Sequence, residues 1–404
     1  MAQQGASLDT RTEEDFVFLG KGRMFMAYVS AAFGFSAMVM AGFLVPLRAK
    51  ELGAPLEVIG LVVGFSGLLP AFLSISAGAL IDRHGPRKAY LWSSVLSALV
   101  ALLSALTSNY WVLGLLQIGA GLFSSMAWLA SQAYVTSLGR SDELPGILGR
   151  MSFSTNAGMV ISPVLIGFSA DMIGYQWSFG TMAVIAAVFA LIGWLLPPVR
   201  LRAKGKAGSA FGITTAARLL RLRGMQAVLI LTLVRVGSVT GWMSFFPLLL
   251  VEHGFSKSMA GSAISVHALL ATFLTLSAGR VAAWMGSVMA ITLALGIGAV
   301  GIALSPVMAD PWLFWIPALL VGVGQGISLP LLIATVSEEA PPEQRGVALG
   351  MRQMANQFGV TFAPIGLGAI AASAGLLAGF VATAGVSIGL LALGYWMHST
   401  VRRA

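Results

Sequence analysis

Twelve long apolar runs dominate this sequence and limit what it can fold into. A membrane-spanning helix needs about 20 mostly apolar residues. With 57% hydrophobic residues and a mean hydropathy of +0.87, nearly the whole chain is predicted to be membrane helix, with no room for a water-soluble domain. The runs lie at 24–47, 56–81, 88–107, 110–138, 145–170, 176–196, 225–250, 257–282, 287–307, 312–337, 345–372 and 376–398.

The first apolar run follows an acidic segment and is too long for the core of a signal peptide. We therefore expect it to remain as a membrane helix instead of being cleaved as a leader. The sequence contains no cysteine, which excludes disulfides and thiol chemistry.

The net charge of +9 is distributed unevenly across the expected membrane. When the helices alternate in direction, 20 of the 24 Lys and Arg residues fall on the side of the termini, while Arg48, Lys50 and Lys257 fall on the other side. The positive-inside rule then predicts that both termini are cytoplasmic. Nucleic acid is not needed to explain the charge, and we expect the basic segment 197–224 to lie against anionic lipid headgroups.

The sequence repeats itself with an offset of 201 residues. Residues 27–85 align with 228–286 without a gap and share thirteen identities, and the register continues from Gly158, Pro163 and Gly167 to Gly359, Pro364 and Gly368. Two parallel repeats imply a pseudo-two-fold axis along the membrane normal, with a site between the halves near the midplane. The expected organisation is a tail at 1–23, a six-helix bundle at 24–196, a linker at 197–224, a second bundle at 225–398 and a tail at 399–404.

The loop after the second apolar run carries an unusual concentration of charge in the stretch SAGALIDRHGPRK. This stretch resembles the signature loop of the major facilitator superfamily, Gly-x-Leu-x-Asp-Arg-x-Gly followed by basic residues, except that Pro86 occupies a position that is usually basic. With the helix count and the repeat, the resemblance covers the whole chain. It implies an all-α membrane protein with twelve transmembrane helices in two pseudo-symmetric six-helix bundles, acting as a secondary transporter.

The resemblance also implies that this loop is a latch that closes the cytoplasmic side. The carboxylate of Asp82 is expected to face either the N-terminal end of the eleventh span or an arginine there, Arg345 or Arg352. A simple positive-inside anchor would explain the basic residues but not the carboxylate. The expected gating residues are Gly78, Asp82, Arg83, Gly85, Arg87 and Lys88, and Arg280 is what remains of this charge in the second half.

Two ionisable residues are expected deep in the membrane, where a charged group costs about 2.5–3.5 kcal/mol and is a functional candidate by default. Arg235 lies near the middle of the seventh span and His267 near the middle of the eighth. Their equivalents in the first half are Gly34 and Ser66, so the fold itself does not require either one. The alternatives are that Arg235 bonds backbone carbonyls or water and that His267 is a neutral packing residue.

Further polar candidates are Arg352 and Asn356, one turn apart in the eleventh span, and Gln325 in the tenth. No Asp or Glu lies deep in any expected span. A cationic site without an internal counter-ion suggests that the substrate supplies the negative charge. We therefore expect a small organic anion, such as a carboxylate, that binds Arg235 through two parallel hydrogen bonds.

The mode of transport stays open at this point. His267 is the only deep side chain with an ordinary pKa near neutrality, so proton coupling would use it, whereas uniport or exchange for a counter-anion would not. The main alternative is a proton-coupled exporter of drugs or amphiphiles. Such exporters usually carry an arginine in the fourth span where this sequence has Gln117, and a Gly-Pro pair in the fifth where it has Ser162 and Pro163. A non-transporting membrane sensor is a further alternative.

Other classes of function are disfavoured by the motifs. The stretch GIGAVG at 296–301 matches a dinucleotide fingerprint, but it lies inside an apolar run with no preceding strand. There is no P-loop, metal-ligand cluster or nucleophilic triad, so we expect neither an enzyme nor a bound cofactor or metal. The expected partners are the lipid bilayer and a small solute, and the expected state is a monomer in the cell inner membrane.

Overall fold

A computed structural model describes residues 21–138, 143–199, 209–308, 310–341 and 344–403. Ten of its helices are long and apolar enough to cross a membrane. Two of these, α5 and α12, are each interrupted by a single nonhelical glycine, Gly174 and Gly375, and so hold two spans each. The chain thus has the predicted twelve spans, and the predicted fold class is confirmed. The helices are α1 (Lys21–Glu51), α2 (Leu56–His84), α3 (Pro86–Leu106), α4 (Tyr110–Thr136), α5 (Leu144–Leu195), α6 (Ser209–Leu219), α7 (Arg223–Glu252), α8 (Lys257–Thr275), α9 (Ala278–Met285), α10 (Ser287–Leu304), α11 (Trp315–Glu338) and α12 (Arg345–Arg403).

Two local features differ from the expected layout. The expected span 257–282 is divided between α8 and α9 by a turn, in which the N–H of Leu276 donates to the Phe273 carbonyl at 3.2 Å and that of Ser277 to the Leu274 carbonyl at 3.0 Å. Thr275 Oγ1 lies 2.9 Å from the Ala271 carbonyl oxygen, and Ser277 Oγ donates to that of Leu274 at 2.8 Å. The expected linker contains α6, which buries Leu219 against the second half.

The internal repeat is visible in the backbone. Every residue with positive φ in the described part of the chain is a glycine, and each has a counterpart 201 residues away. An L side chain would be strained at these turns, so both halves keep glycine there. The pairs are Gly53 with Gly254, Gly85 with Gly286, and Gly174 with Gly375.

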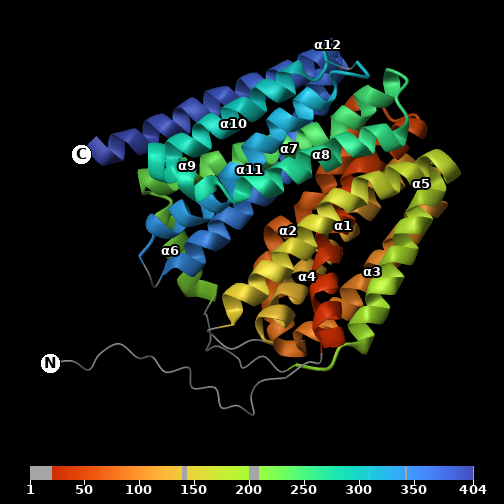
Figure 1. Cartoon of the computed structure of the whole chain (residues 1–404), viewed down its shortest axis with the longest axis horizontal. Coiled ribbons are helices and arrows are strands. Elements are labelled where there is room, and N and C mark those ends of the chain that lie inside the picture. Colours follow the sequence, from red (N-terminus) through yellow and green to blue (C-terminus); the bar gives the residue numbers. More distant parts are fainter. Residues whose placement is uncertain (1–20, 139–142, 200–208, 309, 342–343, 404) are drawn as a thin grey trace.

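The two halves share one apolar core at one end only. There the core joins Phe43 and Leu47 of α1 to Phe245 and Leu249 of α7. Toward the other end the cores are separate, with one in the second half and two in the first. In Figure 1 the two groups of helices lie close together at the upper right and diverge toward the left and lower edges. We call the shared end, where α1 and α7 finish, the closed end, and the other the open end.

Glycines bring helices of opposite halves into backbone contact near the closed end. A Cβ on Gly60 of α2 would collide with the carbonyl oxygen of Pro364 in α12, and a Cβ on Gly261 of α8 would collide with that of Pro163 in α5. These two contacts are related by the same offset of 201 residues. The Gly and Pro pattern that recurs in α5 and α12 therefore serves helix packing between the halves.

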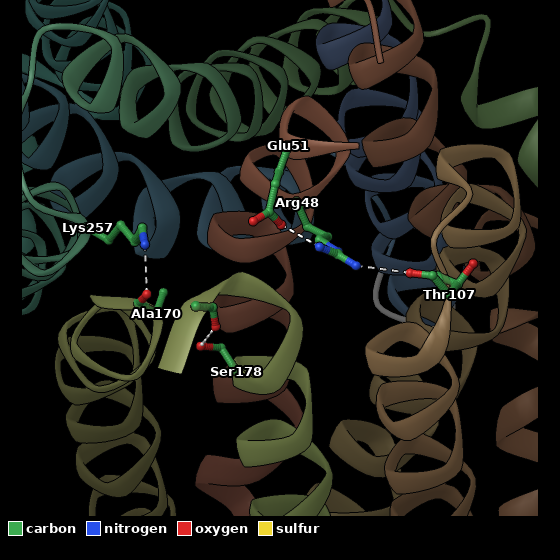
Figure 2. A network of polar contacts seen from close by, with 7 residues as sticks. Arg48, Glu51, Thr107, Ala170, Ser178 and Lys257 are labelled. Carbon is green, nitrogen blue, oxygen red and sulfur yellow. Dashed lines mark hydrogen bonds and ion pairs between the residues drawn. The ribbon is translucent and has the colours of Figure 1, made fainter. Parts of the chain in front are cut away.

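Polar contacts add a clasp between the halves at the closed end, which we define as Lys50, Asp171, Glu252, Lys257 and Ser258. The Asp171 carboxylate accepts from the backbone N–H groups of Lys257 and Ser258, at 2.9 and 2.8 Å, at the N-terminus of α8. Lys257 Nζ donates to the Ala170 carbonyl at 2.8 Å (Figure 2). Lys50 and Glu252 form an ion pair of 3.0 Å between α1 and α7.

Another charged pair at this end, Arg48 and Glu51, lies within the first half. Figure 2 shows that Arg48 of α1 contacts Glu51, at 2.5 Å, and the Thr107 carbonyl oxygen, at 3.1 Å. These bonds tie the end of α1 to the end of α3, which stiffens the half against which the clasp closes.

Candidate functional site

A cavity of about 500 Å³ lies between the two halves. Its lining continues to the open end through Gln132, Ser152, Thr275 and Ile333. Because the shared core and the clasp block the closed end, solutes reach this cavity from the open end. A volume of this order is typical of sites for small organic molecules, which are about 300–1,000 Å³.

Arg235 lines the cavity from α7 and is only partly buried. Among the described residues no carboxylate pairs with its guanidinium, and its Nε has no hydrogen-bond partner. Its backbone carbonyl oxygen accepts a hydrogen bond of 2.9 Å from Gln325 Nε2 of α11. The backbone of Arg235 is thus fixed while its charged group remains available to a ligand.

His267 lines the same cavity from α8 and is 3% exposed. Neither ring nitrogen has a well-formed hydrogen bond within the described part of the chain; the Ile264 carbonyl one turn earlier approaches the ring without suitable geometry. The ring lies 5.5 Å from that of Trp242, whose Nε1 donates to Ser305 Oγ at 2.9 Å. Trp242 therefore supports the imidazole while leaving its nitrogens unpaired.

The close approach of α8 and α11 sets the position of His267. A Cβ on Gly322 of α11 would lie 2.9 Å from the His267 carbonyl oxygen. The first half repeats this contact between Gly121 of α4 and Ser66 of α2. The two halves thus hold these positions alike, and only the side chains differ.

The three other residues predicted to contact the substrate differ in their position relative to the cavity. Asn356 of α12 lines the cavity, and its Oδ1 has no partner among the residues described. Gln325 also lines it, although its amide nitrogen is already engaged by the backbone of Arg235. Arg352 is not part of the lining, but it is close enough to Arg235 to interact with it electrostatically.

The charge of the cavity has one sign. Of the described residues that line it, only Arg235 and His267 are ionisable, and none is Asp, Glu or Lys. No group of three or more His, Cys, Asp or Glu side chains that could hold a metal ion occurs in the part of the chain covered by the structure. The arrangement can attract and orient a negatively charged group from the open end.

The predicted latch lies at the open end. Gly78 and Asp82 fall outside the residues whose side chains the structure describes. Arg83 and Lys88 are exposed, and Gly85, with φ +84°, forms the turn between α2 and α3. Arg87 Nε donates to the Gly193 carbonyl at 3.3 Å, and its Nη2 donates to that of Trp194, so Arg87 joins α3 to the end of α5 within the first half.

Sequence reasoning did not identify the clasp or the open-end polar residues Gln132 and Asn156. Asp171 and Lys257 were visible only as charges at span ends, where charges are common. The repeat carried a usable signal. Lys257 is aligned with Leu56 and Asp171 is aligned with Ala372, so each charge is absent from the equivalent position in the other half. Gln117, which occupies the position where drug exporters usually have arginine, is 3% exposed and lines the cavity.

Comparisons with known proteins agree with the fold. Residues 24–364, and again 291–403, match the family described as the Major Facilitator Superfamily. Class B tetracycline resistance protein of Escherichia coli is 23% identical over 304 residues, 72% of this chain and 73% of that protein. Multidrug resistance protein MdtG of Citrobacter koseri is 25% identical over 334 residues, 81% of each chain. The crystal structure of nucleoside transporter NupG superposes with a TM-score of 0.81 at 16% identity, covering 93% of this chain and 98% of that one. The chain therefore belongs to the major facilitator superfamily of membrane transporters.

Proposed function

We propose that this protein carries a small organic anion, most simply a carboxylate, across the cell inner membrane by alternating access. One observation carries the proposal: the described lining of the central cavity contains an unpaired guanidinium and no carboxylate. A charge that is partly removed from water, as that of Arg235 is, is unfavourable without a partner. An anionic substrate would supply that partner, with Arg235 as the main anchor and His267, Asn356, Gln325 and Arg352 as further or supporting contacts.

The distribution of positive charge gives the orientation in this proposal. By the positive-inside rule the open end, with both termini, faces the cytoplasm. The described conformation is then the inward-facing one, with the clasp and the shared core closing the outside. In the opposite state the loop with Gly78, Asp82 and Gly85 would close the inside against the start of α12, where Arg345 and Arg352 lie.

Proton-coupled export of drugs or amphiphiles is the second candidate. It is favoured by the similarity to the tetracycline and multidrug resistance proteins. In that case a cationic or neutral amphiphile would bind the apolar parts of the cavity, and Arg235 would have a structural or coupling role. In either case His267 is the residue in the cavity best suited to exchange a proton during the cycle.

A thermal-unfolding screen in detergent tests the proposal. Mono- and dicarboxylates, other organic anions, sugars and lipophilic cations are added to the wild type and to Arg235→Gln. A ligand at 100 times its dissociation constant stabilises the folded state by about 2.7 kcal/mol. Stabilisation by anions alone, lost in Arg235→Gln, supports anion transport. Equal stabilisation of both proteins by cations or neutral amphiphiles contradicts it and favours drug export.

The clasp yields a separate prediction about the conformational cycle. Asp171→Ala removes a carboxylate that caps α8 of the opposite half, and loss of such a cap costs about 1 kcal/mol, or roughly five-fold in an equilibrium. We expect the outward-open population to rise by that factor. The measurement is labelling of Ser244→Cys, a cavity position, by an impermeant thiol reagent added outside; the sequence has no other cysteine.

Asp310→Ala is the matched control for this experiment. Asp310 caps the Trp312 N–H at 3.0 Å at the same end, but within its own half. Equal labelling rates in the Asp171 and Asp310 variants would show that the cap between the halves does not affect closure.

A further inference from the structure

The two walls of the central cavity differ in chemistry. All aromatic residues in its described lining come from the first half: Phe33, Phe35, Trp128 and Phe179. Five of the six lining methionines also come from that half, namely Met38, Met40, Met151, Met159 and Met182. Both ionisable residues, Arg235 and His267, come from the second half. The described wall from the second half therefore carries the charge, while the wall from the first half is uncharged: it has the aromatic rings and most of the methionines, together with hydroxyl and amide side chains such as Ser66, Gln117 and Asn156.

From this division we infer that the substrate is an amphiphilic monoanion: one acidic group attached to an apolar body at least as large as a single aromatic ring. This inference rests on the proposed anion transport and specifies its substrate class. The acidic group lies against α7 and α8, and the apolar body lies against α1, α4 and α5.

The rings and methionines of the first half are placed to contact a ligand. Phe35 and Trp128 form an edge-to-face pair with ring centroids 5.1 Å apart, and both are only partly buried although they belong to the protein interior. Met38 is 43% exposed and lines the cavity beside them. Aromatic rings and methionine side chains adapt to apolar ligands of varied shape. A ligand with an apolar body removes this surface from contact with water, whereas a two-carbon acid is too small to cover it.

This wall of the first half includes the repeat position at which the second half carries Arg235. Gly34 occupies the position equivalent to Arg235, and a Cβ on Gly34 would lie 2.7 Å from the backbone nitrogen of Trp128. The small residue thus allows α1 and α4 to approach closely, and the Trp128 side chain lines the cavity from the first half.

A single anionic group fits the charged wall better than two. Arg235 is the only permanently charged side chain among the described lining residues, because Arg352 lies outside that lining. A second carboxylate placed across the cavity would face the first half, whose described lining has rings, methionines, hydroxyls and amides but no cationic side chain. Burial of an unpaired charge of this kind is unfavourable.

Direct binding to purified full-length protein tests the inference, with acetate, benzoate, 2-naphthoate, succinate and the neutral isostere benzamide as probes. We expect benzoate and 2-naphthoate to bind at least ten-fold more tightly than acetate or succinate, and benzamide to bind at least ten-fold more weakly than benzoate. Met38→Gln and Met159→Gln keep the side-chain length and make the wall more polar. Each is expected to weaken benzoate several-fold and to leave acetate unchanged.

Met172→Gln is the matched control, because Met172 is 69% exposed on α5 and is not part of the lining. Arg235→Gln distinguishes a failure of the proposed anion site from a failure of the inferred substrate class. If acetate and succinate bind the wild type as tightly as benzoate, and all three are lost in Arg235→Gln, the anion site stands and the amphiphile inference is wrong. Tight benzamide binding that Arg235→Gln leaves unchanged would overturn the anion site itself.

Discussion

Arg235→Gln is expected to abolish anion binding and, at the same time, to raise the thermal stability of the unliganded protein. Hydrogen bonds to charged groups contribute about 1.5–3 kcal/mol each, so the loss of even one weakens binding at least ten-fold. Stability should change in the opposite direction, because the guanidinium has no counter-ion among the described residues and even its partial burial is unfavourable in the empty cavity.

The prediction is specific because anion binding is expected to weaken while the stability of the unliganded protein is expected to rise. Unfolding temperatures of the two proteins, with and without anion, provide the measurement. Arg221→Gln is the control. Arg221 is exposed in the turn between α6 and α7, so this substitution removes the same charge outside the cavity. If Arg235→Gln instead lowers the stability of the unliganded protein and keeps the anion-induced shift, Arg235 is a structural residue bonded to the protein interior.

Gly60→Leu is expected to keep the two halves apart at the closed end and to reduce transport at least ten-fold. Even the Cβ of the new side chain would meet the backbone carbonyl of Pro364, which cannot move like a flexible side chain. Overpacking costs about 1–3 kcal/mol, which shifts a two-state equilibrium roughly 5- to 150-fold. Gly261→Leu, which meets Pro163 in the symmetry-related contact, should have the same effect.

Outside labelling of Ser244→Cys and the transport rate together measure this effect. Gly366→Leu is the control, because Gly366 lies on α12 two residues from Pro364 and a Cβ there meets nothing within 4 Å. Normal transport by both Gly60→Leu and Gly261→Leu would mean that these helix contacts are not needed in the cycle.

The fold was largely predictable because membrane helices are specified by length and apolarity, which are local properties of the sequence. The repeat added information that single spans lack: the offset of 201 residues aligned Gly53 with Gly254 and Gly174 with Gly375, and both pairs have positive φ. The break after Thr275 was not predicted, since the hydroxyl groups beside it bond to local carbonyls in the same way as those inside the unbroken helices α7 and α11.

Residues of the site could be predicted only where an ionisable side chain falls inside an apolar span. Arg235 and His267 stood out because ionisable groups deep in a membrane are costly. The wall of aromatic and methionine side chains could not be recognised: Met38 lines the cavity and Met289 is exposed outside it, yet both are methionines in apolar runs. The Asp171 contact was also hidden, because its partners are 86 and 87 residues away in the other half.

Solute counterflow tests the central claim most directly, because it requires binding and movement across the membrane but no driving ion. Proteoliposomes are loaded with an excess of the unlabelled anion that stabilises the protein best, and trace labelled anion is added outside. Transient accumulation of label by the wild type, absent in Arg235→Gln and normal in Arg221→Gln, is the predicted result. Stabilisation without any counterflow in the wild type, or counterflow at the wild-type rate in Arg235→Gln, would contradict an anion carrier anchored by Arg235.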